Sequence, residues 1–183
     1  VVLEDPGPAV TLDSDNSVTI ENGGEILIEN VDGATGVVLT GGSTGDFTSN
    51  GRIAVLEDYT ASDSGTDLED IDGDGVADEE DGDADGPFSE GVNRTGVAIV
   101  GVDPFTGGVV FDTQSSLRVF GQDSYGVRVQ APLVGDFTFA GDGLVRGERS
   151  RVLSFENTVT GDILVDGRLQ AVGPDSQGVV IEG

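Results

Sequence analysis

The stretch GQDSYGVRVQAPLVGDFTFAGDGLVRGERSRVLSFENTVTGDILVDGRLQAVGPDSQGVVIEG, residues 121–183, decides the fold because it repeats itself. Gly121, Gly147 and Gly173 follow one another at a constant step of 26 residues (147 − 121 = 173 − 147 = 26). The pair Gly135-Asp136 recurs at the same step as Gly161-Asp162. A period of this length indicates stacked structural units rather than a single globular core.

Each period contains three short segments in which apolar and polar residues alternate, separated by glycine turns. Alternation places one set of side chains on each face of a strand. Segments this short can bury a face if each strand stacks on its counterpart one period away, about 4.8 Å along an axis. The outward set would include Arg128, Thr138 and Ser154. The predicted inward side chains are Val127, Val129, Phe137, Phe139, Leu153, Phe155, Ile163 and Val165.

The fold class predicted is therefore all-β: a parallel β-helix, or solenoid, with three strands per coil and about five to six coils. Residues 1–57 would form the first coils, residues 58–95 an acidic insertion, and residues 96–183 the remaining coils of the same domain. We expect the chain to be a fragment of a longer protein. An antiparallel sandwich also has short alternating strands, but it gives no reason for glycines at a fixed step.

The composition excludes several functions. The formal charge is −27, and all eight basic residues are arginines, so a nucleic-acid partner is excluded by repulsion from phosphate. We expect no direct insertion of this segment into a membrane, because no apolar run approaches the roughly 20 residues that a spanning helix needs. The absence of cysteine rules out disulfides and thiolate metal sites.

The insertion carries a regular pattern of carboxylates, DIDGDGVADEED over residues 70–81. Aspartates at positions 1, 3 and 5, glycine at 6 and carboxylates at 9 and 12 are the spacing of a calcium loop, with a backbone carbonyl at position 7. The last position is Asp rather than Glu, and no helices flank the loop, so a true EF-hand is disfavoured. The alternative is a solvated acidic loop. The predicted Ca²⁺ ligands are Asp70, Asp72, Asp74, Val76, Asp78 and Asp81.

The acidic string resembles the Asp-rich calcium loops of the thrombospondin type 3 class. That resemblance implies that Asp81, with Asp83 and Asp85, begins a second calcium site. The repeats themselves resemble the passenger repeats of autotransporter (type V secreted) proteins, through Ser124-Tyr125-Gly126-Val127, Gly135-Asp136-Phe137, Gly161-Asp162-Ile163 and Ser176-Gln177-Gly178-Val179. This second resemblance implies a right-handed β-helix, export to the bacterial cell surface, and a stalk or adhesive role.

Catalysis is restricted by the missing residue types. Without His, Cys or Lys, the chemistries that remain are glycoside hydrolysis by paired carboxylates and calcium-assisted lyase chemistry with an arginine base. The candidates for the latter are outward arginines such as Arg128, Arg149 and Arg151, although arginines that neutralise an acidic coil are a simpler interpretation. Asp136 and Asp162 could bind a ligand or accept backbone N–H groups in turns. We therefore expect no enzyme.

The predicted function is a calcium-stabilised, extracellular β-helix segment acting as an adhesin or structural stalk. Its partners would be other copies of itself or adjoining β-helix coils, or glycans or proteins of a host or neighbouring cell. The first alternative is a self-assembling surface-layer or filament subunit, since unpaired terminal coils invite edge-to-edge stacking. The second alternative is a polysaccharide lyase or hydrolase built on a β-helix.

Overall fold

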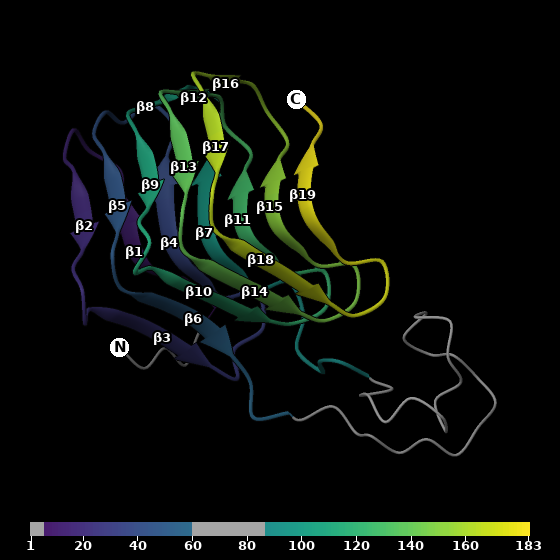
Figure 1. Cartoon of the computed structure of the whole chain (residues 1–183). Helices are drawn as coiled ribbons and strands as arrows, with labels where there is room; N and C mark the ends of the chain where they lie inside the picture. Colours follow the sequence, from purple (N-terminus) through teal and green to yellow (C-terminus); the bar gives the residue numbers. More distant parts are fainter. Residues whose placement is uncertain (1–5, 60–86) are drawn as a thin grey trace, which may run out of the picture.

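The computed structural model describes residues 6–59 and 87–183, and within these ranges the chain is all-β with no helix. Every strand pair is parallel, and the strands stack into a solenoid of about five turns (Figure 1). The predicted fold class is thereby confirmed. Among the described residues there is also no helix long and apolar enough to cross a membrane.

Three main sheets run along the solenoid. Sheet A contains β1 (Pro8–Leu12), β4 (Thr35–Thr40), β7 (Thr95–Val100), β11 (Tyr125–Val129), β15 (Arg151–Phe155) and β19 (Gln177–Ile181). Sheet B contains β2 (Val18–Ile20), β5 (Phe47–Ser49), β9 (Val109–Phe111), β13 (Phe137–Phe139) and β17 (Ile163–Val165). Sheet C contains β3 (Glu25–Glu29), β6 (Arg52–Leu56), β10 (Ser116–Phe120), β14 (Asp142–Arg146) and β18 (Arg168–Val172).

Each coil visits the sheets in the order A, B, C, so coil 1 begins at β1 and coils 2 to 5 begin at β4, β7, β11 and β15. In Figure 1 the sheet A strands run upwards behind the sheet B strands, which run downwards, while the chain advances from left to right. This is a right-handed winding, the sense that parallel crossovers normally take.

The register reproduces the periodicity of the sequence. Leu117 pairs with Gly143, and Gly143 pairs with Leu169, each one step of 26 residues away. Arg52 of coil 2 pairs with Ser116 of coil 3, and Ser116 pairs with Asp142 of coil 4. The register is therefore kept although the insertion separates coils 2 and 3 in the sequence. The step of 26 residues is therefore the length of coils 4 and 5 (151 − 125 = 177 − 151 = 26), whereas coil 1 has a step of 27 (35 − 8) and coil 3 a step of 30 (125 − 95).

The core is a continuous column of apolar side chains inside the coils. The rings of Phe47 and Phe111 lie 5.7 Å apart, those of Phe111 and Phe139 lie 5.1 Å apart, and Phe137 meets Phe155 edge-on at 4.9 Å. All of these rings are buried, as are the predicted inward residues of coil 4. On coil 5, Ile163 is only partly buried and Val165 is 38% exposed, because no further described coil covers them.

Two details differ from the simple three-strand coil. Coils 3 to 5 carry an additional two-residue strand between sheets A and B: β8 (Phe105–Thr106), β12 (Leu133–Val134) and β16 (Val159–Thr160). Phe105, in the first of these strands, is fully buried. Ser154 was expected to point outwards and is 1% exposed, since Arg151 Nη1 and Glu156 Oε1 lie 3.5 and 3.4 Å from its hydroxyl.

The repeated glycines allow the corners of successive coils to touch. A Cβ on Gly135, at φ 148°, would lie 2.2 Å from the carbonyl oxygen of Gly107 in the coil below. A Cβ on Gly147, at φ 141°, would lie 2.2 Å from the carbonyl oxygen of Gly121. Only glycine combines this backbone conformation with such a close approach.

Candidate binding site at the base of the acidic insertion

The acidic insertion leaves the solenoid after β6 and returns just before β7, at the corner where sheet C passes to sheet A. In coils 4 and 5 this corner takes four residues, 147–150 and 173–176. Between β6 and β7 the chain instead runs from residue 57 to residue 94, of which 57–59 and 87–94 are described. Both described ends of the insertion thus lie side by side on the solenoid.

Arg94 is the central residue of this corner because its side chain contacts Val31, Asp32, Glu57 and Phe120. It stands where the later coils have a serine: Ser124 N–H donates to the Ser150 hydroxyl at 3.1 Å, and Ser150 N–H to the Ser176 hydroxyl at 3.0 Å. Arg94 enters this ladder by donating its own N–H to the Ser124 hydroxyl at 3.0 Å. Its side chain is 3% exposed.

The guanidinium joins three parts of the chain. Nε donates to the Val31 carbonyl at 3.1 Å, and Nη1 donates to the Phe120 carbonyl at 2.8 Å. Nη1 also donates to Glu57 Oε2 at 2.8 Å, and Nη2 to Asp32 Oδ1 at 3.2 Å. These contacts connect the corner before β4, the end of β6 and the end of β10.

Glu57 completes the connection from the other end of the insertion. Its side chain is 5% exposed, and its two oxygens accept the N–H of Glu90 at 3.1 Å and of Gly91 at 2.7 Å. A Cβ on Gly91 would lie 2.2 Å from the Arg94 guanidinium carbon, so a larger residue here would displace the guanidinium from its present position. A buried carboxylate with a guanidinium and two amide donors is fully satisfied.

A second pair of hydrogen bonds holds the first residues of the insertion, where the chain leaves β6. Asn30 Nδ2 donates to Asp58 Oδ2 at 2.7 Å, and Asp58 N–H donates to Asn30 Oδ1 at 3.0 Å. Asn30 adopts φ 60°, a left-handed conformation that asparagine tolerates better than most residues. The two ends of the insertion are therefore tied separately to the same corner.

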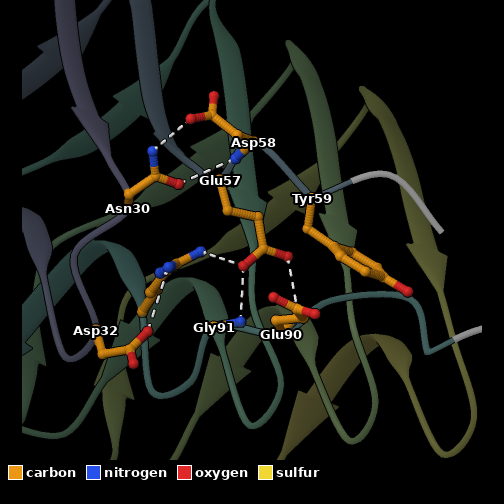
Figure 2. Close-up of a pocket in the computed structure, with 8 residues that line it drawn as sticks. Asn30, Asp32, Glu57, Asp58, Tyr59, Glu90 and Gly91 are labelled. Atoms are coloured by element: carbon orange, nitrogen blue, oxygen red, sulfur yellow. Dashed lines mark hydrogen bonds and ion pairs between the residues drawn. The ribbon is translucent and has the colours of Figure 1, made fainter.

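These residues surround an open cavity of about 510 Å³, which is also lined by Tyr59 (Figure 2). The lining has one guanidinium, from Arg94, against four carboxylates, from Asp32, Glu57, Asp58 and Glu90. In the ranges 6–59 and 87–183, no three His, Cys, Asp or Glu side chains lie close enough together to hold a metal ion. The cavity is an acidic recess at the root of the insertion.

The predicted calcium ligands lie outside the described residues. These are Asp70, Asp72, Asp74, Val76, Asp78, Asp81, Asp83 and Asp85. The calcium assignment therefore stays a prediction.

The arginines proposed for lyase chemistry are engaged by carboxylates. Arg128 forms a bidentate ion pair with Glu156, with hydrogen bonds of 2.7 and 3.1 Å, and its guanidinium lies 4.2 Å from the centre of the Tyr125 ring. Arg151 contacts Glu182 at 3.4 Å. Each guanidinium thus already has a charged partner.

Arg149 is exposed and paired with carboxylates on two sides. It bonds Asp123 with two nitrogens, at 2.9 and 2.8 Å, and Glu148 at 2.8 Å. The hydrogen bonds that Arg149 donates to Asp123 and Glu148 raise the pKa of its guanidinium, and those donated to Asp123 hold the pKa of that carboxyl below its ordinary value. Arg149 also adopts φ 53°, an uncommon conformation for a long side chain.

Asp136 has a structural contact. Its Oδ1 accepts the N–H of Asp162 at 2.9 Å, and Asp46 Oδ1 likewise accepts the N–H of Gly108 at 2.8 Å. These aspartates connect one coil to the next in the manner expected of turn residues.

Sequence reasoning missed the pairing of Arg94 with Glu57. The available signal was that no basic residue occurs between Arg52 and Arg94, so Arg94 is the first cation after a long acidic segment.

Compared with protein-family models, with curated proteins and with solved structures, the chain matches none.

Proposed function

We propose that this chain is a non-enzymatic segment of an exported, cell-surface β-helix, which presents its acidic insertion as a calcium-binding adhesive element. The observation that supports this most directly is the pairing of Arg94 with Glu57 at the root of the insertion. Two side chains with only 3% and 5% exposure fasten both ends of residues 58–95 to a stiff stack of parallel strands. A rigid support of this kind suits a stalk that carries a recognition element.

Calcium is the ligand that best explains the composition of the insertion. Carboxylates at the spacing Asp70, Asp72, Asp74, Asp78 and Asp81 repel one another unless a cation neutralises them. Calcium would therefore order the insertion, and with it the surface that contacts a glycan or protein of another cell.

The calcium proposal is tested by isothermal titration of the full chain, first stripped with EGTA. We expect saturable calcium binding that is lost in the double variant Asp72→Asn, Asp74→Asn. Asp166→Asn, which removes an exposed carboxylate on coil 5, is the matched control and should bind as the parent does. Equal binding by the parent and the double variant would refute the assignment.

The pairing of Arg128, Arg149 and Arg151 with carboxylates supports a role other than lyase chemistry, because a paired guanidinium is a poor base. The second alternative, an enzyme acting on polysaccharides, is tested by incubating the chain with calcium and polygalacturonate. New absorbance from unsaturated uronates that disappears with Arg128→Gln would favour the enzyme. Activity independent of that arginine would point to a contaminant.

The first alternative is a self-assembling subunit, and the observation that supports it is the exposed apolar side chains of β19, the last described strand. There Val179 is 42% exposed and Ile181 is 61% exposed, and β17, β18 and β19 each have one edge without a described partner strand. Apolar core positions next to open strand edges promote stacking of further coils. The partner would be another copy of the chain or an adjoining β-helix coil.

Light scattering after size exclusion distinguishes a self-assembling subunit from a monomeric stalk or adhesin. A subunit that stacks end to end should show a mass that rises with concentration and falls to the monomer in Val179→Lys. A monomeric mass at every concentration would leave the stalk or adhesin as the function.

A further inference from the structure

A polar trough lies at the corner between sheets B and C, at the far end of β6 from the insertion. It forms because the corners differ in length. Coils 1 and 3 use four residues there, 21–24 and 112–115, whereas coil 2 uses two, Asn50 and Gly51. The short corner of coil 2 is recessed between its longer neighbours, which leaves an open volume of about 330 Å³.

The two longer corners meet across this recess. Asn22 Nδ2 donates to Gln114 Oε1, a contact from coil 1 to coil 3 that passes over coil 2. Around it the trough is lined by backbone of Gly24 and Gly51 and by the hydroxyl-bearing residue Ser116. One wall carries the ion pair of Glu25 with Arg52, whose side chains are 43% and 41% exposed.

Asn50 provides an unmet hydrogen-bonding group in this trough. Its Oδ1 is buried and has no partner among the described residues. A buried acceptor without a donor costs about 1–3 kcal/mol, so native structures usually supply one. The terminal torsion of asparagine is soft, so the oxygen can turn towards a donor that enters the trough.

The lining selects the chemical class of ligand. Among the residues that the structure describes, no aliphatic or aromatic side chain lines the trough, which disfavours lipids and aromatic compounds. The charged residues in the described lining are Glu25 and Arg52, which are paired with each other, so neither a cation nor an anion finds an uncompensated partner there. The net charge of −27 further disfavours anionic ligands.

We propose that this trough binds a neutral saccharide. Amide, hydroxyl and backbone groups that alternate between donors and acceptors match the hydroxyls of a sugar, and an acetamido N–H would satisfy Asn50. A volume near the lower limit of ligand pockets, about 300 Å³, suits a short saccharide end. The trough lies on the solenoid itself, so recognition here would be independent of the calcium-dependent insertion.

The test is a titration of the ¹⁵N-labelled full chain with N,N′-diacetylchitobiose, with cellobiose as a second neutral probe. We expect saturable shifts of the Gly23, Gly24 and Gly51 amides with at least one probe at millimolar concentration. The shifts should persist in EGTA, which separates this result from the calcium proposal. Asn50→Ala should weaken binding about tenfold, the equivalent of one hydrogen bond.

Thermal unfolding of the same variants separates binding from a structural role. Asn50→Ala removes an unpaired group, so its melting temperature should equal or exceed that of the parent while binding is weakened. Asn157→Ala, on coil 5, is the control and should bind normally. Absence of saturable shifts with both probes, shifts confined to other surfaces, or unchanged affinity in Asn50→Ala would overturn the proposal.

Discussion

Replacing Arg94 by methionine should destabilise the protein far more than the same change at Arg52. Arg94 and Glu57 are 3% and 5% exposed, and methionine would leave the Glu57 carboxylate buried with two amide donors but no cation. It would also leave the Val31 and Phe120 carbonyls without the donors they now have. Removing one partner of a buried pair costs about 3–5 kcal/mol.

Arg52 provides the matched control because it too is paired with a glutamate, Glu25, which lies in a neighbouring strand. Those side chains are 41% and 43% exposed, so the pair is solvated. Exposed pairs contribute about 0–1 kcal/mol. The free energies of unfolding of Arg94→Met and Arg52→Met should therefore differ by about 2–5 kcal/mol, as the burial of each pair requires.

The assay is equilibrium unfolding in urea, followed by circular dichroism, in EGTA so that calcium does not contribute. Adding Glu57→Gln to Arg94→Met should restore part of the lost stability, because the uncompensated charge is removed. Equal effects of Arg94→Met and Arg52→Met would refute the reasoning that burial makes this pair important. Additive effects of the two substitutions at Arg94 and Glu57 would refute their direct coupling.

Three further predictions follow from single positions. Ser49→Ala should raise the free energy of unfolding in urea by about 1 kcal/mol, because the Ser49 hydroxyl is buried in the core without a partner. Gly135→Ala should lower the melting temperature, since its Cβ would meet a backbone oxygen at 2.2 Å, whereas Gly178→Ala, with nothing within 4 Å, should leave it unchanged or higher. The lowered pKa of Asp123 means that its pair with Arg149 is intact at neutral pH and is lost as the pH falls through that pKa. A titration followed by NMR should show the Asp123 pKa return towards its ordinary value in Arg149→Ala and in high salt.

The coil and its inward side chains could be predicted from the sequence alone. A parallel solenoid places equivalent residues one above the other, so each coil needs the same turn glycines and the same apolar positions, and the repeat becomes visible as a step of 26 residues. The pairing of Leu117, Gly143 and Leu169 follows that step. In this fold the turn residues and the buried core residues therefore recur with the same period.

The position of Phe105 could not be predicted in this way. It belongs to a two-residue strand, too short for alternation to be recognised, and it is fully buried next to Leu133 of the following coil. Ser154 is buried although it is polar and outward, because Arg151 and Glu156 reach over it. Both outcomes depend on side chains from neighbouring positions rather than on the local pattern.

What the sequence determined by itself is the repeated coil and the acidic insertion between two of its strands, because periodicity and charge are properties of the chain. Only the tertiary structure decided that Arg94 and Glu57 meet, that Asn22 reaches Gln114, and that Asn50 lies recessed between them. Arg94 and Glu57 are 37 positions apart in the sequence, and Asn22 and Gln114 are 92 positions apart. Asn50 is 28 positions from Asn22 (50 − 22). Whether these residues meet in space depends on how many residues each corner contains and on which coils are neighbours. Neither of these can be read from the residues themselves.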